Sequence, residues 1–125
     1  APSLVGSEMC IRDSSFPAIL KQVIDVSSAA WKAKPVAFIS YGGVSGGLRA
    51  VEQLRLVYAE LHAVTVRNVV SIINAGDKFD ARGRWQSVEQ KVRAEKRLMQ
   101  QLAVLRWWAQ SLKAGRRRPE FAAVS

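Results

Sequence analysis

The sequence predicts an α/β protein with parallel strands in one sheet, and three features support this fold class. Residues 36–40 form a short apolar run after Pro35, which is typical of a buried strand whose start is marked by proline. A glycine-rich loop and a helical pattern follow, and residues 64–73 form a second run rich in β-branched side chains. A helix that joins two strands makes them parallel neighbours. We therefore expect a sheet covered by helices.

Length and composition exclude several classes of protein. The chain has 125 residues, 49% of them hydrophobic, which is enough for one domain with a core. No apolar run reaches membrane-spanning length, and the single Cys10 excludes a disulfide framework and a multi-cysteine metal site. The only histidine, His62, lies near an expected helix end, so we assign it a surface or capping role. We expect a cytoplasmic protein without a metal or a membrane contact.

The loop at residues 42–47 contains four glycines, which permit positive φ and let backbone N–H groups approach a flat or anionic ligand. We expect Ser45 to cap the following helix, whose N-terminus carries free donors. Val44 breaks a dinucleotide-binding fingerprint, and Leu48 stands where a P-loop needs lysine. The alternative is a tight turn with no ligand. The apolar stripe of the helix comprises Leu48, Val51, Leu54, Tyr58 and Leu61.

Two further helices are expected, over residues 15–28 and 87–112. In the first, Ser15 is the expected cap and Pro17 suits the first turn. Its apolar stripe comprises Phe16, Ile19, Leu20, Val23 and Ile24. In the last helix, Glu89 and Arg93 are spaced for an ion pair, and the expected buried face comprises Val88, Val92, Met99, Leu102, Leu105 and Leu112. One ring of the pair Trp107 and Trp108 should point inward, and the other should lie in a subunit interface or over aliphatic surface.

Three segments resemble the NADPH-dependent FMN reductase family, whose members have a flavodoxin-like fold. Residues 40–55, SYGGVSGGLRAVEQLR, are similar to the loop and helix after its fourth strand. Residues 15–25 resemble the segment that begins the helix after strand three, and residues 31–35, WKAKP, resemble the approach to strand four. The resemblance implies a flavodoxin-like three-layer α/β sandwich with a parallel sheet. Of that fold, this chain would supply strands four and five with helices three to five.

The resemblance also implies a function. An enzyme of this family transfers a hydride from NADPH or NADH through bound FMN to an acceptor such as a flavin, a quinone or an azo compound. The flavin carries the redox chemistry, so no catalytic side chain is expected. Relatives commonly pair subunits around the flavin, which implies a homo-oligomeric parent. The implied cofactor contacts are Ser40, Tyr41, Gly42, Gly43, Val44 and Ser45, with a second contact loop of Ser15, Phe16 and Pro17.

The ends of the chain fall outside this pattern. Residues 3–14 look like a translated sequencing adaptor, so we treat residues 1–14 as a non-native or disordered leader, with a natural disordered leader as the alternative. Arg12, Asp13 and Ser14 stand where the family has a glutamate-tyrosine-asparagine motif. We therefore expect residues 15–113 to be a partial domain that is inactive alone and binds FMN weakly or not at all. Residues 114–125 are expected to be a basic, disordered tail.

The formal net charge of +9 is the main competing clue. A basic surface can bind the phosphates of nucleic acid, or an acidic partner. The alternative function is therefore a small, basic, non-enzymatic binding module. No zinc-ligand spacing, aromatic RNA platform or helix-turn-helix pattern accompanies the charge, so nucleic acid is the weaker interpretation.

Overall fold

The computed structural model describes residues 15–124 as a mixed α/β fold with a two-stranded parallel sheet and three α-helices. In chain order the elements are α2 (Ala18–Val26), η1 (Ser28–Trp31), β1 (Pro35–Tyr41), α3 (Leu48–Glu60), β2 (Val64–Ile72), η2 (Ala75–Asp77), α4 (Val88–Gly115) and η3 (Pro119–Ala123). The leader expected over residues 1–14, with Cys10, lies outside the described residues.

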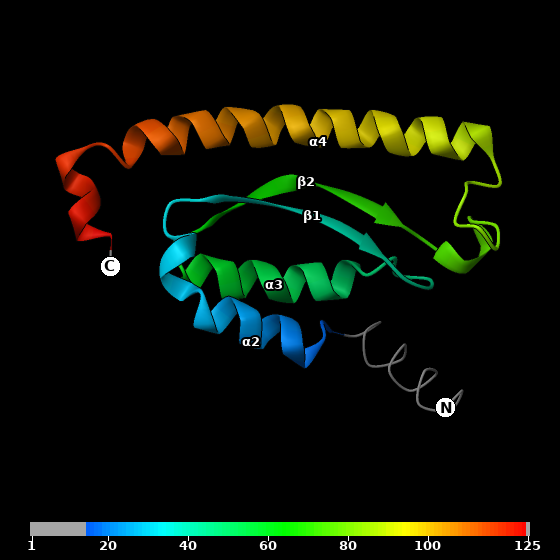
Figure 1. The fold of residues 1–125 in the computed structure, drawn as a ribbon, viewed down its shortest axis with the longest axis horizontal. Coiled ribbons are helices and arrows are strands. Elements are labelled where there is room, and N and C mark those ends of the chain that lie inside the picture. Colours follow the sequence, from blue (N-terminus) through cyan, green and yellow to red (C-terminus); the bar gives the residue numbers. More distant parts are fainter. Residues whose placement is uncertain (1–14, 125) are drawn as a thin grey trace.

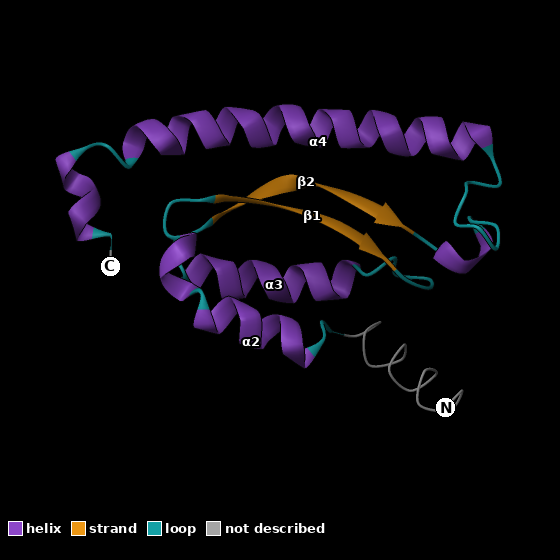
Figure 2. Cartoon of the chain, in the orientation of Figure 1, coloured by secondary structure: helices purple, strands orange, loops and turns teal. Residues whose placement is uncertain are grey.

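The elements form three layers (Figure 1), and Figure 2 distinguishes the two strands from the helices around them. The long helix α4 packs on both strands from one face, and α3 packs on both strands from the other. The second layer of helices also contains α2, which lies beside α3. Because α3 joins β1 to β2, the strands run in the same direction and both end at the same edge of the sheet.

The ladder between β1 and β2 contains a bulge. Val36 pairs with Thr65, but Phe38 pairs with Val69, so Ala37 alone lies opposite three residues of β2. Extra residues in one strand leave backbone groups without ladder partners. Those groups need hydrogen bonds from elsewhere, because an unsatisfied buried carbonyl is costly.

Side chains from both helix layers supply these bonds. Gln101 of α4 is almost fully buried, and its Nε2 donates to the carbonyl oxygens of Phe38 at 2.7 Å and Asn68 at 2.8 Å. On the other face Arg55 donates from Nη2 to the carbonyl oxygen of Arg67 at 3.0 Å. The bulge thus joins β2 to both α4 and α3.

The core lies mainly between the sheet and the layer of α2 and α3. Tyr58 is central, because its ring lies 4.9 Å from that of Trp31 and 6.0 Å from that of Phe38. Burial raises the pKa of the Tyr58 hydroxyl above its ordinary value. The buried cluster comprises Ile24, Phe38, Val51, Leu54 and Tyr58.

The expected strands and helices are present, and the first helix starts later than expected. The expected helix over residues 15–28 begins at Ala18 with Pro17 as its N-cap, because Ser15 instead donates from Oγ to Gln53 Oε1 at 2.5 Å. The prediction that Ser45 caps α3 is wrong: Gly47 is the N-cap, in a left-handed conformation and without a side-chain bond. His62 follows α3 with a φ of 57°, in agreement with a role at the helix end.

The buried face predicted for α4 is mostly wrong. Val88 and Met99 are 77% and 66% exposed, and Val92 and Leu102 are exposed as well. The half-buried or buried positions are centred on another side of the helix and comprise Gln90, Ala94, Leu98, Gln101, Val104, Leu105, Trp108, Ala109 and Leu112. The helix therefore carries apolar side chains on two sides, and the sheet covers the side that contains Gln101.

The C-terminal segment after residue 113 contains the end of α4 and a short 3-10 helix. α4 continues to Gly115, and the guanidinium of Arg116 donates from Nη1 to the carbonyl oxygen of Ala33 at 2.6 Å. A short 3-10 helix follows, and Arg118 at its N-cap lies 3.7 Å from Glu120. Trp108 is half-buried and Trp107 is exposed, as the sequence predicts for that pair. Among the described helices, none combines the length and the apolar character that a membrane crossing requires.

Candidate functional site

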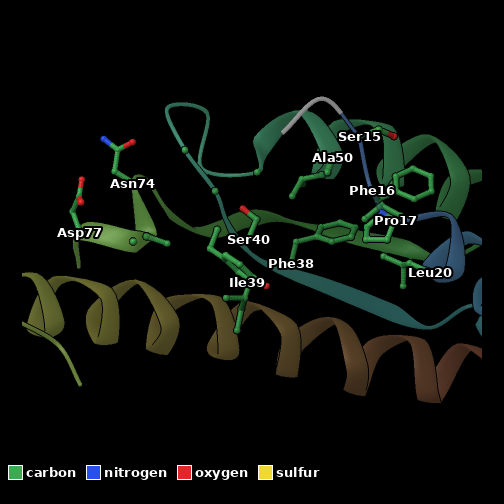
Figure 3. Close-up of a pocket in the computed structure, with 18 residues that line it drawn as sticks. Ser15, Phe16, Pro17, Leu20, Phe38, Ile39, Ser40, Ala50, Asn74 and Asp77 are labelled. Carbon is green, nitrogen blue, oxygen red and sulfur yellow. The ribbon is translucent and has the colours of Figure 1, made fainter. Parts of the chain in front are cut away.

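A pocket of about 570 Å³ lies where β1 leaves the sheet. Phe38 of β1 and Ala50 of α3 form its inner part, the segment at Ser15–Pro17 closes one side, and Asn74 and Asp77 lie at the other end (Figure 3). The lining residues are Ser15, Phe16, Pro17, Leu20, Phe38, Ile39, Ser40, Tyr41, Gly42, Gly43, Gly47, Ala50, Val51, Leu54, Asn74, Ala75, Gly76 and Asp77.

The end of the glycine loop is fixed by two serines. The carbonyl oxygen of Gly46 accepts a hydrogen bond from Ser40 Oγ at 2.8 Å and another from Ser71 Oγ at 2.9 Å. A Cβ atom at Gly46 would lie 2.2 Å from Ser71 Oγ, and φ there is +61°. One carbonyl thus ties the loop to both strands, and only glycine fits its position.

The next position, Gly47, also has no room for a side chain. Its φ is +78°, and a Cβ atom would lie 2.9 Å from the carbonyl oxygen of Tyr41. The chain therefore turns sharply from strand to helix within the pocket wall, with the first turn of α3 directly behind it.

The first part of the same loop is bound to the segment that follows β2. Gly42 donates from its N–H to the carbonyl oxygen of Ile72 at 3.2 Å, while Asn74 and Ala75 donate to Gly43 and Gly42 at 2.9 and 3.1 Å. These bonds extend the pairing of the strands beyond the sheet. The two loops at the strand ends consequently form one rigid rim.

Gly43 and Gly47 offer backbone donors in the pocket wall. Within residues 15–124, the N–H groups of Gly43 and Gly47 donate to no other group. The rest of the inner wall is apolar and includes Phe38, Leu54 and Val51. Such a wall suits a flat, largely apolar ligand that also has a few hydrogen-bond acceptors.

The pocket is open along β1. Within the described residues this strand pairs only with β2, so its other edge is free. Ile39 and Tyr41 line the pocket from this strand, yet they are 61% and 70% exposed. The open side admits a ligand but buries it incompletely.

Seven of the nine residues expected to contact a cofactor meet in this pocket. They are Ser15, Phe16, Pro17, Ser40, Tyr41, Gly42 and Gly43. Val44 and Ser45 do not line it: Val44 lies at the loop tip with 88% of its surface exposed, and Ser45 is half-buried behind that tip. The assignment of all nine residues as cofactor contacts stays a prediction.

The sequence reasoning missed the apolar wall and the second rim. Phe38, Val51 and Leu54 were recognised only as strand and helix residues, although their spacing placed them beside the glycine loop. The rim at residues 74–77 carried a weaker signal, namely that it follows the neighbouring parallel strand. Ligands in open α/β sheets bind at the carboxyl ends of neighbouring strands, which could have identified it.

Basic side chains are frequent on α4 and in the segment after it. Several of those on α4 and beyond have partners: Arg93 pairs with Glu89, Lys91 lies 3.8 Å from Glu95, and Arg116 binds a backbone carbonyl. Across residues 15–124, no three side chains of His, Cys, Asp or Glu gather closely enough to hold a metal ion.

Comparison with protein families gives one match. A family model described as NADPH-dependent FMN reductase matches residues 11–77, which is more than half of the chain. The chain belongs to this family. The comparison finds no match among curated proteins or solved structures.

The family match and the pocket coincide. All residues that line the pocket, from Ser15 to Asp77, fall within the stretch that matches the NADPH-dependent FMN reductase family. A flavin reductase type of function is therefore indicated for the family portion of the chain. α4 lies beyond the matched residues.

Proposed function

We propose that this chain is built for NAD(P)H-dependent flavin oxidoreduction and that its pocket at the end of β1 holds the ring system of FMN. The observation that carries the proposal is the combination in one pocket of a bare-backbone loop, two available N–H donors and an apolar wall. The pocket volume of about 570 Å³ lies within the usual range for cofactor-sized ligands.

The residues present fit this cofactor. A flavin ring is flat and apolar on its faces and carries acceptor atoms on one edge. Phe38 and Leu54 would pack against the ring, and the N–H groups of Gly43 and Gly47 would donate to its edge. The N-terminus of α3 lies just behind the loop and carries a partial positive charge. That charge would stabilise negative charge on the nearby edge of the ring.

The protein contributes binding and placement. When bound, FMN would supply the redox chemistry that links a nicotinamide nucleotide to an acceptor. Among the pocket residues, the side chains of Tyr41 and Asp77 are exposed at the rim, where they would limit how a nicotinamide or an acceptor enters. The glycine loop would place no side chain on the part of the ring that it meets.

We also propose a correspondence with the flavodoxin-like sheet. In this assignment β1 and β2 are its fourth and fifth strands, and α2, α3 and α4 are helices three to five. The parallel pairing and the position of the glycine loop at the end of β1 support it. The free edge of β1 would then be the place of a neighbouring strand.

The open side has a consequence for affinity. Because Ile39 and Tyr41 stay exposed along the free edge of β1, the pocket leaves part of a bound ring in water. Less apolar burial means less binding free energy. We propose that the chain of 125 residues binds FMN more weakly than micromolar and is a poor enzyme by itself.

A fluorescence titration tests the proposal, with increasing protein added to a fixed low concentration of FMN. Ala50→Phe fills the pocket from α3 and should abolish quenching. Ala59→Phe makes the same change at an exposed position of α3 outside the pocket and should leave quenching unchanged.

Three results would count against the proposal. The absence of any quenching by the unmodified chain would reject flavin binding. Equal quenching by the Ala50→Phe variant would reject this pocket as its location. Micromolar or tighter affinity would reject the proposed weakness of the open pocket.

A further inference from the structure

A second pocket lies on the opposite face of the sheet, between the end of β2 and the first half of α4. Its volume is about 210 Å³, and it shares no lining residue with the pocket at the end of β1. The lining residues are Val70, Ser71, Ile72, Ile73, Lys78, Trp85, Gln90, Arg93, Ala94 and Arg97.

The polar part of this second pocket is cationic. Lys78, Arg93 and Arg97 line it, and no acidic residue does. Arg93 is paired with Glu89, which lies outside the lining. Within residues 15–124, the side chains of Lys78 and Arg97 make no hydrogen bond or ion pair. Two positive charges are therefore available to a ligand.

The apolar part of the second pocket includes the ring of Trp85, whose contacts fix its orientation. Trp85 is half-buried, its ring lies 4.5 Å from the ring of Phe79, and a β-bridge joins the two residues. Phe79 belongs to a turn that Asp80 closes with three hydrogen bonds. The indole is thus held in place beside the cations, where it can receive a second flat ring.

We propose that this second pocket binds a small aromatic anion. The charged group of the ligand lies near Lys78 and Arg97, and its ring lies against Trp85 and the apolar side chains at the end of β2. The volume is below the usual range for drug-sized ligands, which selects a compact ligand of about one ring over a dinucleotide.

This site is separate from the proposed flavin reductase function. The three cations and Trp85 lie after residue 77, outside the stretch that matches the reductase family. The cationic and aromatic parts of the second pocket thus lie outside the matched stretch, and the proposed binding does not depend on a bound flavin.

Phenyl phosphate is the probe, and calorimetric titration gives its affinity. Three related compounds separate the contributions: benzoate has the ring with a single charge, inorganic phosphate has the charge without a ring, and benzyl alcohol has the ring without a charge. We expect phenyl phosphate to bind tightest and its affinity to fall as salt is added. The indole N–H resonance of Trp85, assigned with a Trp85→Phe variant, should shift during the titration.

A pair of charge variants locates the site. Lys78→Gln with Arg97→Gln should weaken phenyl phosphate binding by about tenfold or more, because charge-assisted hydrogen bonds are lost. Arg106→Gln with Lys113→Gln removes the same charge from exposed positions of α4 outside the pocket and should change the affinity less than about twofold.

The outcomes are distinct from those of the flavin titration. Equal binding of inorganic phosphate and phenyl phosphate, or equal losses in the two double variants, would overturn the proposal in favour of a general cationic surface. No binding of phenyl phosphate would also overturn it. The Ala50→Phe variant should still bind phenyl phosphate, so a failed flavin site leaves this result unchanged.

Discussion

Gly46 carries the tightest steric demand among the described glycines. Alanine there would combine a φ of +61° with a Cβ atom 2.2 Å from Ser71 Oγ. We expect Gly46→Ala to lower the free energy of unfolding by about 3 kcal/mol, since backbone strain and a clash add. Urea denaturation measures the change.

Gly83 provides the matched control, because its φ is +74° but a Cβ atom there would meet nothing within 4 Å. Gly83→Ala should cost only about 1 kcal/mol, the expense of the left-handed conformation alone. Equal losses in the two variants would show that the contact with Ser71 is unimportant.

Gln101 gives a second prediction at the scale of a residue. Gln101→Leu keeps the side chain large but leaves the carbonyl oxygens of Phe38 and Asn68 without their donor. We expect a loss of about 2 kcal/mol or more in the free energy of unfolding. Gln100→Leu, at the exposed neighbouring position of α4, should stay within about 0.5 kcal/mol of the unmodified protein. Similar values for both variants would contradict the role assigned to the bulge carbonyls.

Single residues differ in how well the sequence reveals them. Glycines are informative because few other roles require four of them between a strand and a helix, and the loop was predicted from them. Gln101 was not predicted, because glutamine in a helix is usually exposed and nothing local marks a bulge in a distant strand. Ser45 failed as a cap because the chain turns through Gly46 and Gly47 before the helix begins.

The turn after β2 is an element whose stability depends on pH. Asp80 accepts hydrogen bonds from the backbone N–H groups of Arg84 and Arg82 and from the Arg84 side chain, and these hold its pKa below the ordinary value of 3.8. A lowered pKa means that the ionised carboxylate stabilises the folded turn. This contribution is present above pH 3.8 and is lost as the pH falls through the lower value of the folded turn.

NMR spectra recorded on acidification test this behaviour. The amide resonances of Arg82 and Arg84 should titrate with a midpoint below pH 3.8, and Asp80→Asn should remove the transition. A midpoint at or above pH 3.8 would contradict the stabilising role of the carboxylate.

The elements were predicted more reliably than their faces. The extent of α4, predicted over residues 87–112 and observed over Val88–Gly115, follows from local signals. The choice of buried face failed because α4 carries apolar side chains on two sides. Only tertiary packing decides which of the two sides is buried. The hydrogen bond from Gln101 to the sheet fixes the side of α4 that carries it.

At the scale of the whole molecule, the free edge of β1 is a site where copies of the chain can associate. An exposed apolar edge strand pairs readily with other strands, and Ile39 lies exposed on this one. We expect the chain to self-associate as its concentration rises and Ile39→Lys to suppress this. Sedimentation velocity measures the effect.

Val26→Lys serves as the control for that experiment, because Val26 is an exposed apolar residue on α2 and not on the strand. It should leave self-association unchanged. If both variants reduced association equally, general surface hydrophobicity rather than the strand edge would be responsible.

The most direct test of the flavin site is an NMR titration of the isotopically labelled chain with FMN at high concentration. The account predicts weak, saturable binding in which the backbone N–H resonances of Gly43 and Gly47 shift most, with no comparable shift at α4. Saturable binding that leaves both glycine resonances unmoved, or no binding at any concentration, would contradict it.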